Sequence, residues 1–185
     1  MPNPFEAVWN TLKTSIDSID EEKMPLHVLE VGDCWRYLTA LEEFIRYEEI
    51  GLHTTSDDEV REALEDVKTL CEAQSKQLGQ FMIKEGIPLP DVTPAKPESQ
   101  SKEVPMGVKL TDDEIINGIS LKLVICLQQC ALGQANAIRN DIGIMWLKYF
   151  SDWVSAGNTL KTLSKKRGWI KVPPYYYTPG SPIKR

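Results

Sequence analysis

The chain has 185 residues, a formal net charge of -6 and 42% hydrophobic residues, which is the composition of one ordinary globular domain over residues 1–185. The acidic excess disfavours DNA or RNA as the main partner, because phosphate binding needs a concentrated cationic surface. The chain has no unbroken run of about 18 apolar residues and no basic leader before an apolar stretch, so we expect no membrane span, no signal peptide and a cytoplasmic location.

A short amphipathic helix is predicted over residues 4–22, because apolar side chains recur there at helical spacing. These side chains belong to Phe5, Val8, Trp9, Leu12, Ile16 and Ile19. Such a helix can dock in a groove of a partner, although its commonest role is to cover the core of its own chain.

Two long helices are predicted over residues 26–86, the first from about Leu26 to Leu52 and the second from about Asp57 to Glu85. Only a few residues join them, so we expect antiparallel neighbours. The polar residues of the first helix are expected on its outer face; they are Glu42, Glu43, Arg46 and Glu48.

Local signals predict where the second helix begins and ends. Ser56, followed three residues later by Glu59, has the pattern of a capping box, which satisfies free amide groups at a helix start. Gly86 is expected to end the helix in a left-handed conformation, and Pro88 and Pro90 prevent the helix from resuming.

Two further helices are predicted over residues 111–168. A second capping box, Thr111 to Glu114, begins the third helix, and Gly168 ends the fourth. The apolar pattern weakens near Asn140, and one unbroken helix over this stretch would be about 85 Å long. A chain of this size cannot cover such a helix, so we expect a turn near Asn140 and a fourth helix from about Asp141.

Four helices of similar length favour a four-helix bundle, because each apolar stripe must be covered along its whole length. The 24 residues 87–110 follow the second helix and are rich in proline, serine and lysine. Extended, they reach about 80 Å, which is enough for a crossover along the bundle. The alternative is a disordered linker with simple up-down topology. We therefore expect an all-α, ferritin-like four-helix bundle with a long crossover between helices two and three, an extra N-terminal helix and an extended C-terminal tail.

Four stretches carry a resemblance to a known family. They are PLHVLEVGDCW at residues 25–35, KEGIPLP at 84–90, IRND at 138–141 and RGWIKVPPYY at 167–176. In this order and spacing, most of the chain resembles one copy of an uncharacterised ferritin-like domain family of spore-forming bacilli. Many members of that family hold two copies of the bundle, and members are often described as spore-coat-like. The resemblance implies the bundle fold and a connection with sporulation, but no established activity.

The tail, residues 169–185, begins with apolar residues and prolines. Trp169, Ile170 and Val172 are expected to pack back on the end of the bundle, while the two prolines that follow stiffen the chain as it leaves. The next three residues would continue this packing or contact a neighbouring subunit; they are Tyr175, Tyr176 and Tyr177.

The C-terminal region is strongly basic. Residues 161–185 contain seven Lys/Arg and no Asp or Glu. One interpretation is a solvated segment that complements the negative end of a helix dipole. The other is a docking arm for an acidic partner.

A di-iron site of the ferritin type needs a Glu from each of two helices and Glu-x-x-His from each of the other two. The sequence contains no Glu-x-x-His, and its two histidines are His27 and His53. These lie about 39 Å apart along one helix, so they cannot share a site within one chain. No cofactor and no catalytic or metal-binding residue is therefore assigned from the sequence.

Four cysteines fall on the predicted helices: Cys34, Cys71, Cys126 and Cys130. An all-cysteine cluster for zinc or another soft metal is geometrically imaginable. The favoured interpretation is that they are small, reduced core residues, which is where free cysteines usually lie. A cysteine nucleophile formed by His27 and Cys34 is disfavoured, because the base must reach the thiol directly.

Several polar residues are predicted to interrupt the apolar faces; they are Glu30, Asp33, Gln74, Gln128 and Gln129. We expect Glu30 to form a buried ion pair with Arg139 or Lys122 that fixes helix register, the alternative being an isolated surface residue. Gly133 and Gly157 lie inside helices, where glycine permits close approach of a neighbouring helix.

The leading functional interpretation is a non-enzymatic structural or interaction protein, connected with the spore coat or sporulation through the family resemblance alone. We expect a protein partner, or self-association as a homodimer, through apolar residues near the two ends of the chain: Phe5, Trp9, Trp169, Tyr175, Tyr176 and Tyr177. The alternative is a ferritin-like bundle that binds a metal or small ligand through non-standard ligands.

Overall fold

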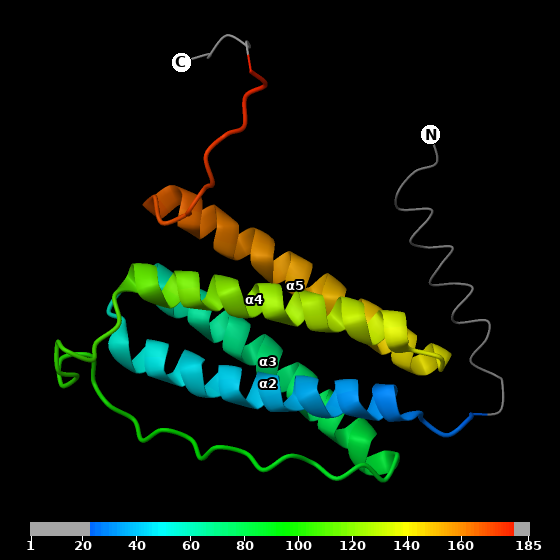
Figure 1. Cartoon of the computed structure of the whole chain (residues 1–185). Coiled ribbons are helices and arrows are strands. Elements are labelled where there is room, and N and C mark those ends of the chain that lie inside the picture. The colour runs from blue at the N-terminus through cyan, green and yellow to red at the C-terminus, as the bar shows by residue number, and fades with distance from the viewer. Residues whose placement is uncertain (1–22, 180–185) are drawn as a thin grey trace.

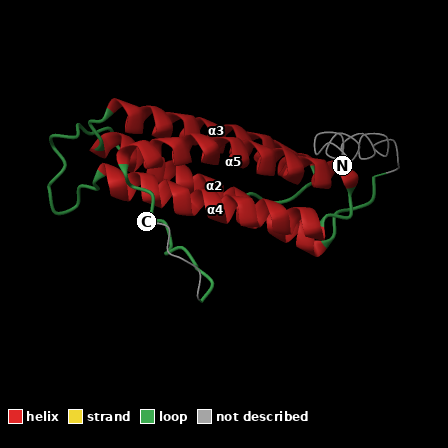
Figure 2. Cartoon of the chain, turned by 90° about the horizontal axis from the view of Figure 1, so that it is seen from above, coloured by secondary structure: helices red, strands yellow, loops and turns green. Residues whose placement is uncertain are grey.

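The computed structural model describes residues 23–179, and this part of the chain contains four helices and no strand. The helices are α2 (Val28–Thr54), α3 (Asp58–Lys84), α4 (Asp112–Asn136) and α5 (Asn140–Arg167). They lie side by side along one direction (Figures 1 and 2), so the predicted all-α four-helix bundle is confirmed. The helix predicted over residues 4–22, with Phe5 and Trp9, lies outside the described residues.

The bundle is built from two antiparallel helix pairs, as the short connections predicted. α2 packs against α3, and α4 packs against α5. The pairs then meet through α2 against α4 and α3 against α5. Each helix therefore has two neighbours, and the apolar stripes of all four face one core.

The connection between α3 and α4, residues 87–110, runs along α2 for the length of the bundle (Figure 1). The Thr93 hydroxyl donates a hydrogen bond of 2.6 Å to Glu43, and the Ser101 hydroxyl donates one of 2.6 Å to the carbonyl oxygen of Thr54. These contacts hold the segment against the middle and the C-terminal end of α2. The predicted crossover is confirmed, and the alternative of a disordered linker is wrong.

Three of the predicted helix-end signals are confirmed. Gly86 and Gly168 have φ angles of 74° and 71°, the left-handed conformation in which glycine ends a helix. At the start of α4, Thr111 and Glu114 form the predicted capping box.

The capping box predicted from Ser56 is wrong. The N-cap of α3 is Asp57, whose carboxylate accepts the N–H groups of Glu59 and Val60. Asp57 lies one residue nearer to these amides, and its negative charge is favoured at the positive end of the helix dipole. The Ser56 side chain is exposed.

The centre of the bundle is an aromatic cluster. Tyr37 of α2 lies 5.2 and 5.8 Å from Trp146 and Tyr149 of α5, measured between ring centroids. Gly133 of α4 makes room for this cluster, because a Cβ there would lie 2.4 Å from the Trp146 ring. A Cβ at Gly157 would lie 3.2 Å from a leucine of α4. The predicted close approach at both glycines is confirmed.

The tail follows the prediction at its first two residues. Trp169 packs against the core, and Ile170, 38% exposed, lies against α4 and α5 beside Leu123 and Leu160. Val172 is 56% exposed, so the prediction that it packs back on the bundle is wrong. Tyr175 and Tyr176 are 77% and 85% exposed, and the chain leaves the end of α5 (Figure 1). They do not continue the packing, because the two prolines before them hold the chain extended. Contact with a neighbouring subunit stays a prediction.

α4 is the most apolar of the helices. An 18-residue stretch of α4 has a mean hydropathy of 1.6. By length and composition alone, the helix could cross a membrane. The helix has no unbroken apolar run of this length, because polar residues such as Asn117, Ser120 and Lys122 interrupt it. Core helices of globular proteins pass the same test, yet only 33% of this stretch is buried in the bundle. Much of its apolar surface therefore faces outward.

Candidate functional site in the bundle interior and on α4

A buried ion pair joins Glu48 of α2 to Lys122 of α4. Lys122 Nζ lies 3.6 Å from Glu48 Oε1 and sits over the rings of Tyr47 and Phe44, at 3.6 and 4.7 Å from their centroids. Glu48 is fully buried, and neither of its carboxylate oxygens accepts a hydrogen bond from the described residues. The prediction that Glu48 lies on the outer face is wrong, because position 48 continues the inward stripe three residues after Ile45.

Burial shifts the pKa of both members of this pair toward neutral pH. It raises the pKa of Glu48 to about 7, although the charge of Lys122 opposes the shift. It lowers the pKa of Lys122 to about 8, although the charge of Glu48 opposes that shift. Near neutral pH the interior therefore holds two titratable groups whose protonation states depend on each other.

The four cysteines are buried on three different helices: Cys34 on α2, Cys71 on α3, and Cys126 and Cys130 on α4. Burial raises the pKa of every one of these thiols, to about 12 for Cys34 and Cys130. Within residues 23–179, no three His, Cys, Asp or Glu side chains gather in a group that could hold a metal ion. This arrangement favours core packing over a zinc cluster.

His27 is engaged at the end of the bundle and does not serve Cys34. Its Nδ1 accepts the N–H of Leu29 at 3.1 Å, which makes His27 the N-cap of α2. Its Nε2 lies 2.9 Å from the carbonyl oxygen of Asn136, to which it donates. Both ring nitrogens are therefore occupied away from the thiol.

A polar network links three helices beside the aromatic cluster. The Tyr37 hydroxyl donates to Gln74 Oε1 at 2.6 Å, and Trp153 Nε1 donates to both, at 2.6 and 3.0 Å. Gln74 Nε2 in turn donates to Asp152 at 3.4 Å. Buried polar groups that satisfy one another in this way fix a single packing arrangement, so we assign the network a structural role.

Glu30 ties the start of α2 to the turn between α4 and α5. Its Oε1 accepts the N–H groups of Ile138 and Arg139 at 2.8 and 2.9 Å, and its Oε2 accepts the N–H of His27 at 3.1 Å. Burial alone would raise the pKa of Glu30, but these N–H groups lower it. The prediction of an ion pair with Arg139 or Lys122 is wrong, because Glu30 accepts from the backbone of Arg139 and not from its guanidinium.

The guanidinium of Arg139 has other partners. It donates two hydrogen bonds, of 2.7 and 2.9 Å, to the carboxylate of Glu85 just after α3, and it pairs with Asp141 in the first turn of α5. Burial raises the pKa of Asp141, but hydrogen bonds from Arg139 and Lys23 outweigh this effect and lower it to about 2. Together with Glu30, these residues form what we call the end clamp.

The other polar residues predicted to point inward divide between core and surface. Asp33 and Gln74 are buried, as predicted. Asp33 accepts hydrogen bonds from Gln129 at 3.2 Å and from Asn136 at 2.7 Å. Gln128 is exposed, so that prediction is wrong.

The sequence contained a signal for the Glu48–Lys122 pair that hydropathy alone did not reveal. Lys122 lies four residues before Cys126, and Glu48 lies three residues after Ile45, so both charges occupy core-facing positions. Opposite charges at core-facing positions of two helices predict a buried ion pair once those helices are known to be neighbours.

Beyond its acidic first turn, the outer surface of α4 is mostly apolar. Between Ile115 and Asn136 the one charged residue is Lys122, which is turned toward Glu48. We call the exposed apolar residues of this helix the α4 stripe: Leu121, Val124, Ile125 and Leu132. Phe150 and Val154 of α5 add two more exposed apolar side chains. Exposed apolar surface of this extent marks an interaction site more often than a solvated face.

A family model described as "Protein of unknown function (DUF3231)" matches residues 14–181. The chain belongs to this family. The DUF3231 chain is similar to the uncharacterized protein YvdQ of Bacillus subtilis strain 168. The two are 24% identical over 152 residues, which cover 82% of this chain and 89% of YvdQ. The resemblance to an uncharacterised family of bacilli is confirmed.

Solved structures extend the comparison. The DUF3231 chain is similar to a "putative spore coat protein" of Bacillus halodurans C-125, with a TM-score of 0.79 and 26% identity, covering 84% of this chain and 98% of that one. A two-domain protein of Anabaena variabilis with DJ-1/ThiJ/PfpI-like and ferritin-like domains has a TM-score of 0.59 and 15% identity, covering 83% of this chain and 41% of that one. The fold is therefore ferritin-like, as predicted.

Proposed function

We propose that this DUF3231 chain is a non-enzymatic structural protein that assembles with other proteins in the spore coat. The connection with the spore is supported by the similar protein of Bacillus halodurans, whose name assigns it to the coat. A structural role is supported by the network of Tyr37, Gln74 and Trp153, whose polar groups satisfy one another and fix one packing of the helices.

The α4 stripe is the observation that carries the proposal. Ile125 and Leu132 are 50% and 42% exposed on a helix whose one charged residue beyond the first turn, Lys122, faces Glu48. Covering such a face with a second protein removes apolar surface from water. Each Å² removed favours the complex by about 25 cal/mol. The exposed tyrosines of the tail, which suit protein interfaces, would extend the contact.

Localisation during sporulation tests the proposal. A fluorescent fusion of the whole chain would be produced in sporulating Bacillus subtilis cells. We expect it to move from a uniform distribution to a shell around the developing spore. The double substitution Ile125→Glu with Leu132→Glu places two charges on the α4 stripe, and this variant should stay dispersed.

A matched control separates the stripe from charge in general. Val28→Glu with Ile83→Glu changes two exposed apolar residues on α2 and α3, away from the stripe, and should leave the shell intact. A wild-type fusion that remains dispersed throughout sporulation would reject the coat assignment. A shell formed equally by the stripe variant would reject the α4 stripe as the contact surface.

A further inference from the structure

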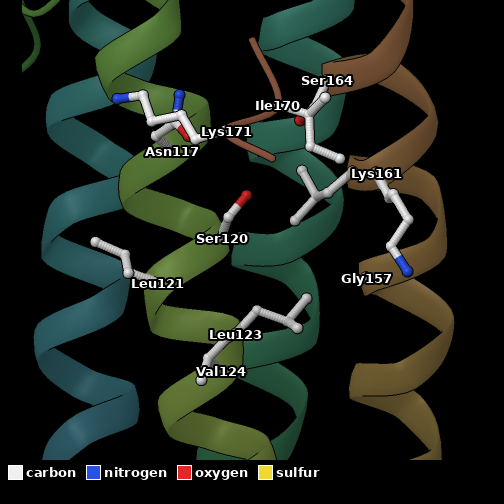
Figure 3. Close-up of a pocket in the computed structure, with 11 residues that line it drawn as sticks. Asn117, Ser120, Leu121, Leu123, Val124, Gly157, Lys161, Ser164, Ile170 and Lys171 are labelled. Carbon is white, nitrogen blue, oxygen red and sulfur yellow. The ribbon is translucent and has the colours of Figure 1, made fainter. Parts of the chain in front are cut away.

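A groove lies between α4 and α5 near the C-terminal end of α5, where the first residues of the tail cross it (Figure 3). Its volume is about 440 Å³, within the range of small-molecule sites. Five apolar side chains form most of its walls: Leu121, Leu123, Val124, Leu160 and Ile170. The groove contributes nothing to the interior network, and its lining is distinct from the buried Glu48–Lys122 pair.

Small residues open this space between two packed helices. Ser120 of α4 and Gly157 and Ser164 of α5 line the groove where larger side chains would fill it. A Cβ at Gly157 would already lie 3.2 Å from Leu123, so the two helices approach as closely as they can there. The groove is thus bounded on its inner side by a tight helix contact and remains open toward solvent.

The two charged groups that line the groove are both cationic. Lys161 and Lys171 line it, and no Asp or Glu does. Neither lysine forms an ion pair with a residue of the described range 23–179; Glu114 is the acidic group whose pKa the charge of Lys171 helps to lower. Ser164 also lines the groove, where its hydroxyl can donate to a bound ligand.

We infer that this groove binds a free medium-chain carboxylate, such as a fatty acid of about ten carbons. The apolar walls hold the alkyl chain. Lys161 and Lys171 lie on opposite sides of the groove (Figure 3) and make its rim positive, which attracts the carboxylate, and the Ser164 hydroxyl is a further donor. The lined part of α4, from Asn117 to Val124, is about 10 Å long by helical rise, which suits a medium rather than a long chain. This inference rests on the groove and its two lysines rather than on the proposed role in the coat, although Leu121 and Val124 belong to both the groove and the α4 stripe.

Calorimetric titration of the whole chain with decanoate tests the inference. We expect one molecule of decanoate to bind per chain. Decanol, with the same alkyl chain and no charge, should bind about tenfold more weakly, since a charge-assisted contact is worth about 1.4 kcal/mol or more. Decyltrimethylammonium, which carries the opposite charge, should not bind.

Two variants place the ligand in the groove. Lys161→Glu with Lys171→Glu should weaken decanoate binding at least about tenfold. The control Lys84→Glu with Lys102→Glu changes the net charge by the same amount on exposed residues outside the groove and should bind as the wild type does. Val124→Trp fills the groove from an exposed position and should abolish binding, while circular dichroism confirms that the helices are intact.

Several results would overturn the inference. They are no binding of decanoate, equal binding of decanoate and decyltrimethylammonium, or equal weakening by the two lysine double variants. Unchanged binding by Val124→Trp would also overturn it. Adsorption to phosphatidylglycerol vesicles without binding of free decanoate would show that the surface meets a membrane and not a free carboxylate.

Discussion

The carboxylate of Glu48 and the ammonium group of Lys122 lie 3.6 Å apart inside the bundle, with no other hydrogen-bond donor from the described residues to the carboxylate. Burial disfavours the charged form of each group, and the charge of the partner favours it. The thiols of Cys71 and Cys126 also face this pair, but their raised pKa values keep them neutral. The stability of the bundle should therefore depend on pH in a specific way.

The Glu48–Lys122 pair should contribute a minimum, between about pH 7 and 8, to the pH profile of the free energy of unfolding. The folded pKa of Glu48 lies above its ordinary value of 4.5, so folding favours the neutral form and stability falls as pH rises from 4.5 to about 7. The folded pKa of Lys122 lies below 10.5, so its own contribution rises again from about pH 8 to 10.5, while the four buried thiols, whose pKa values are raised, lower the total stability above about pH 9. Urea unfolding at closely spaced pH values measures this, and a profile that rises steadily from pH 5 to 8 would contradict it.

Removing one member of the pair should cost far more than removing both. Lys122→Met leaves Glu48 buried and unpaired, which costs about 3–5 kcal/mol at pH 8. The loss should be smaller at pH 5, where Glu48 takes up a proton. Glu48→Met with Lys122→Met should restore wild-type stability or exceed it by about 1–4 kcal/mol, and should abolish the minimum in the pH profile. Equal losses in the single and double variants would show that the pair is not coupled.

Gly133→Ala should destabilise the bundle although alanine is the better helix former. The added Cβ would lie 2.4 Å from the Trp146 ring, and overpacking of this kind costs about 1–3 kcal/mol. Gly79→Ala is the matched control, because its Cβ meets nothing within 4 Å and should stabilise α3 by about 0.5–1 kcal/mol. Urea unfolding of both variants gives the comparison, and changes of the same sign would contradict it.

The end clamp should fail in acid. The folded pKa values of Glu30, Glu85 and Asp141 are all lowered, to about 2 for Asp141. The stability that they contribute is therefore complete above their ordinary pKa values and is lost as the pH falls from about 4 to 2. Unfolding followed by circular dichroism across this range measures the loss.

Substitution of the buried carboxylate should reproduce part of this effect at neutral pH. Glu30→Gln removes a charge that accepts three N–H groups and should cost about 1.5–3 kcal/mol. Glu62→Gln, an exposed carboxyl on α3, is the control and should change stability by less than about 0.5 kcal/mol. If Glu30→Gln leaves the free energy of unfolding unchanged, Glu30 does not contribute to stability as the end clamp requires.

The four thiols should react only when the chain opens. Reaction with a disulfide reagent needs an exposed thiolate, and all four side chains are buried with raised pKa values. We expect no rapid reaction of the native protein at pH 8 and four reactive thiols in concentrated urea. Rapid reaction of one native thiol would identify an accessible cysteine and revive the question of cysteine chemistry.

The sequence predicted the helices and their connection well because those signals are local. The left-handed glycines Gly86 and Gly168, the Thr111 capping box and the length of the crossover depend on the segment itself. Glu48 and Glu30 were predicted less well, because their partners come from helices far away in the sequence. A carboxylate on α2 gives no sign of its own whether it meets a lysine, two backbone amides or water.

The groove between α4 and α5 was beyond sequence reasoning for a related reason. The groove forms because Gly157 of α5 packs against Leu123 of α4 and because Lys171 of the tail lies beside both helices. Both are contacts between residues far apart in the sequence. The exposure of the α4 stripe could not be predicted for another reason. Periodicity showed an apolar helix, but only the packing showed that much of its apolar surface has no neighbour within the bundle.

The crossover along α2 has a consequence for how the molecule can be divided. Because residues 87–110 lie on the surface and the two helical hairpins on either side are each formed by short connections, a cut within this segment separates the chain without breaking any helix. The two halves would each present an apolar face with no partner but the other half. A nicked chain should therefore remain folded as a two-fragment complex, and separately produced halves should reconstitute the bundle at a rate set by their concentration.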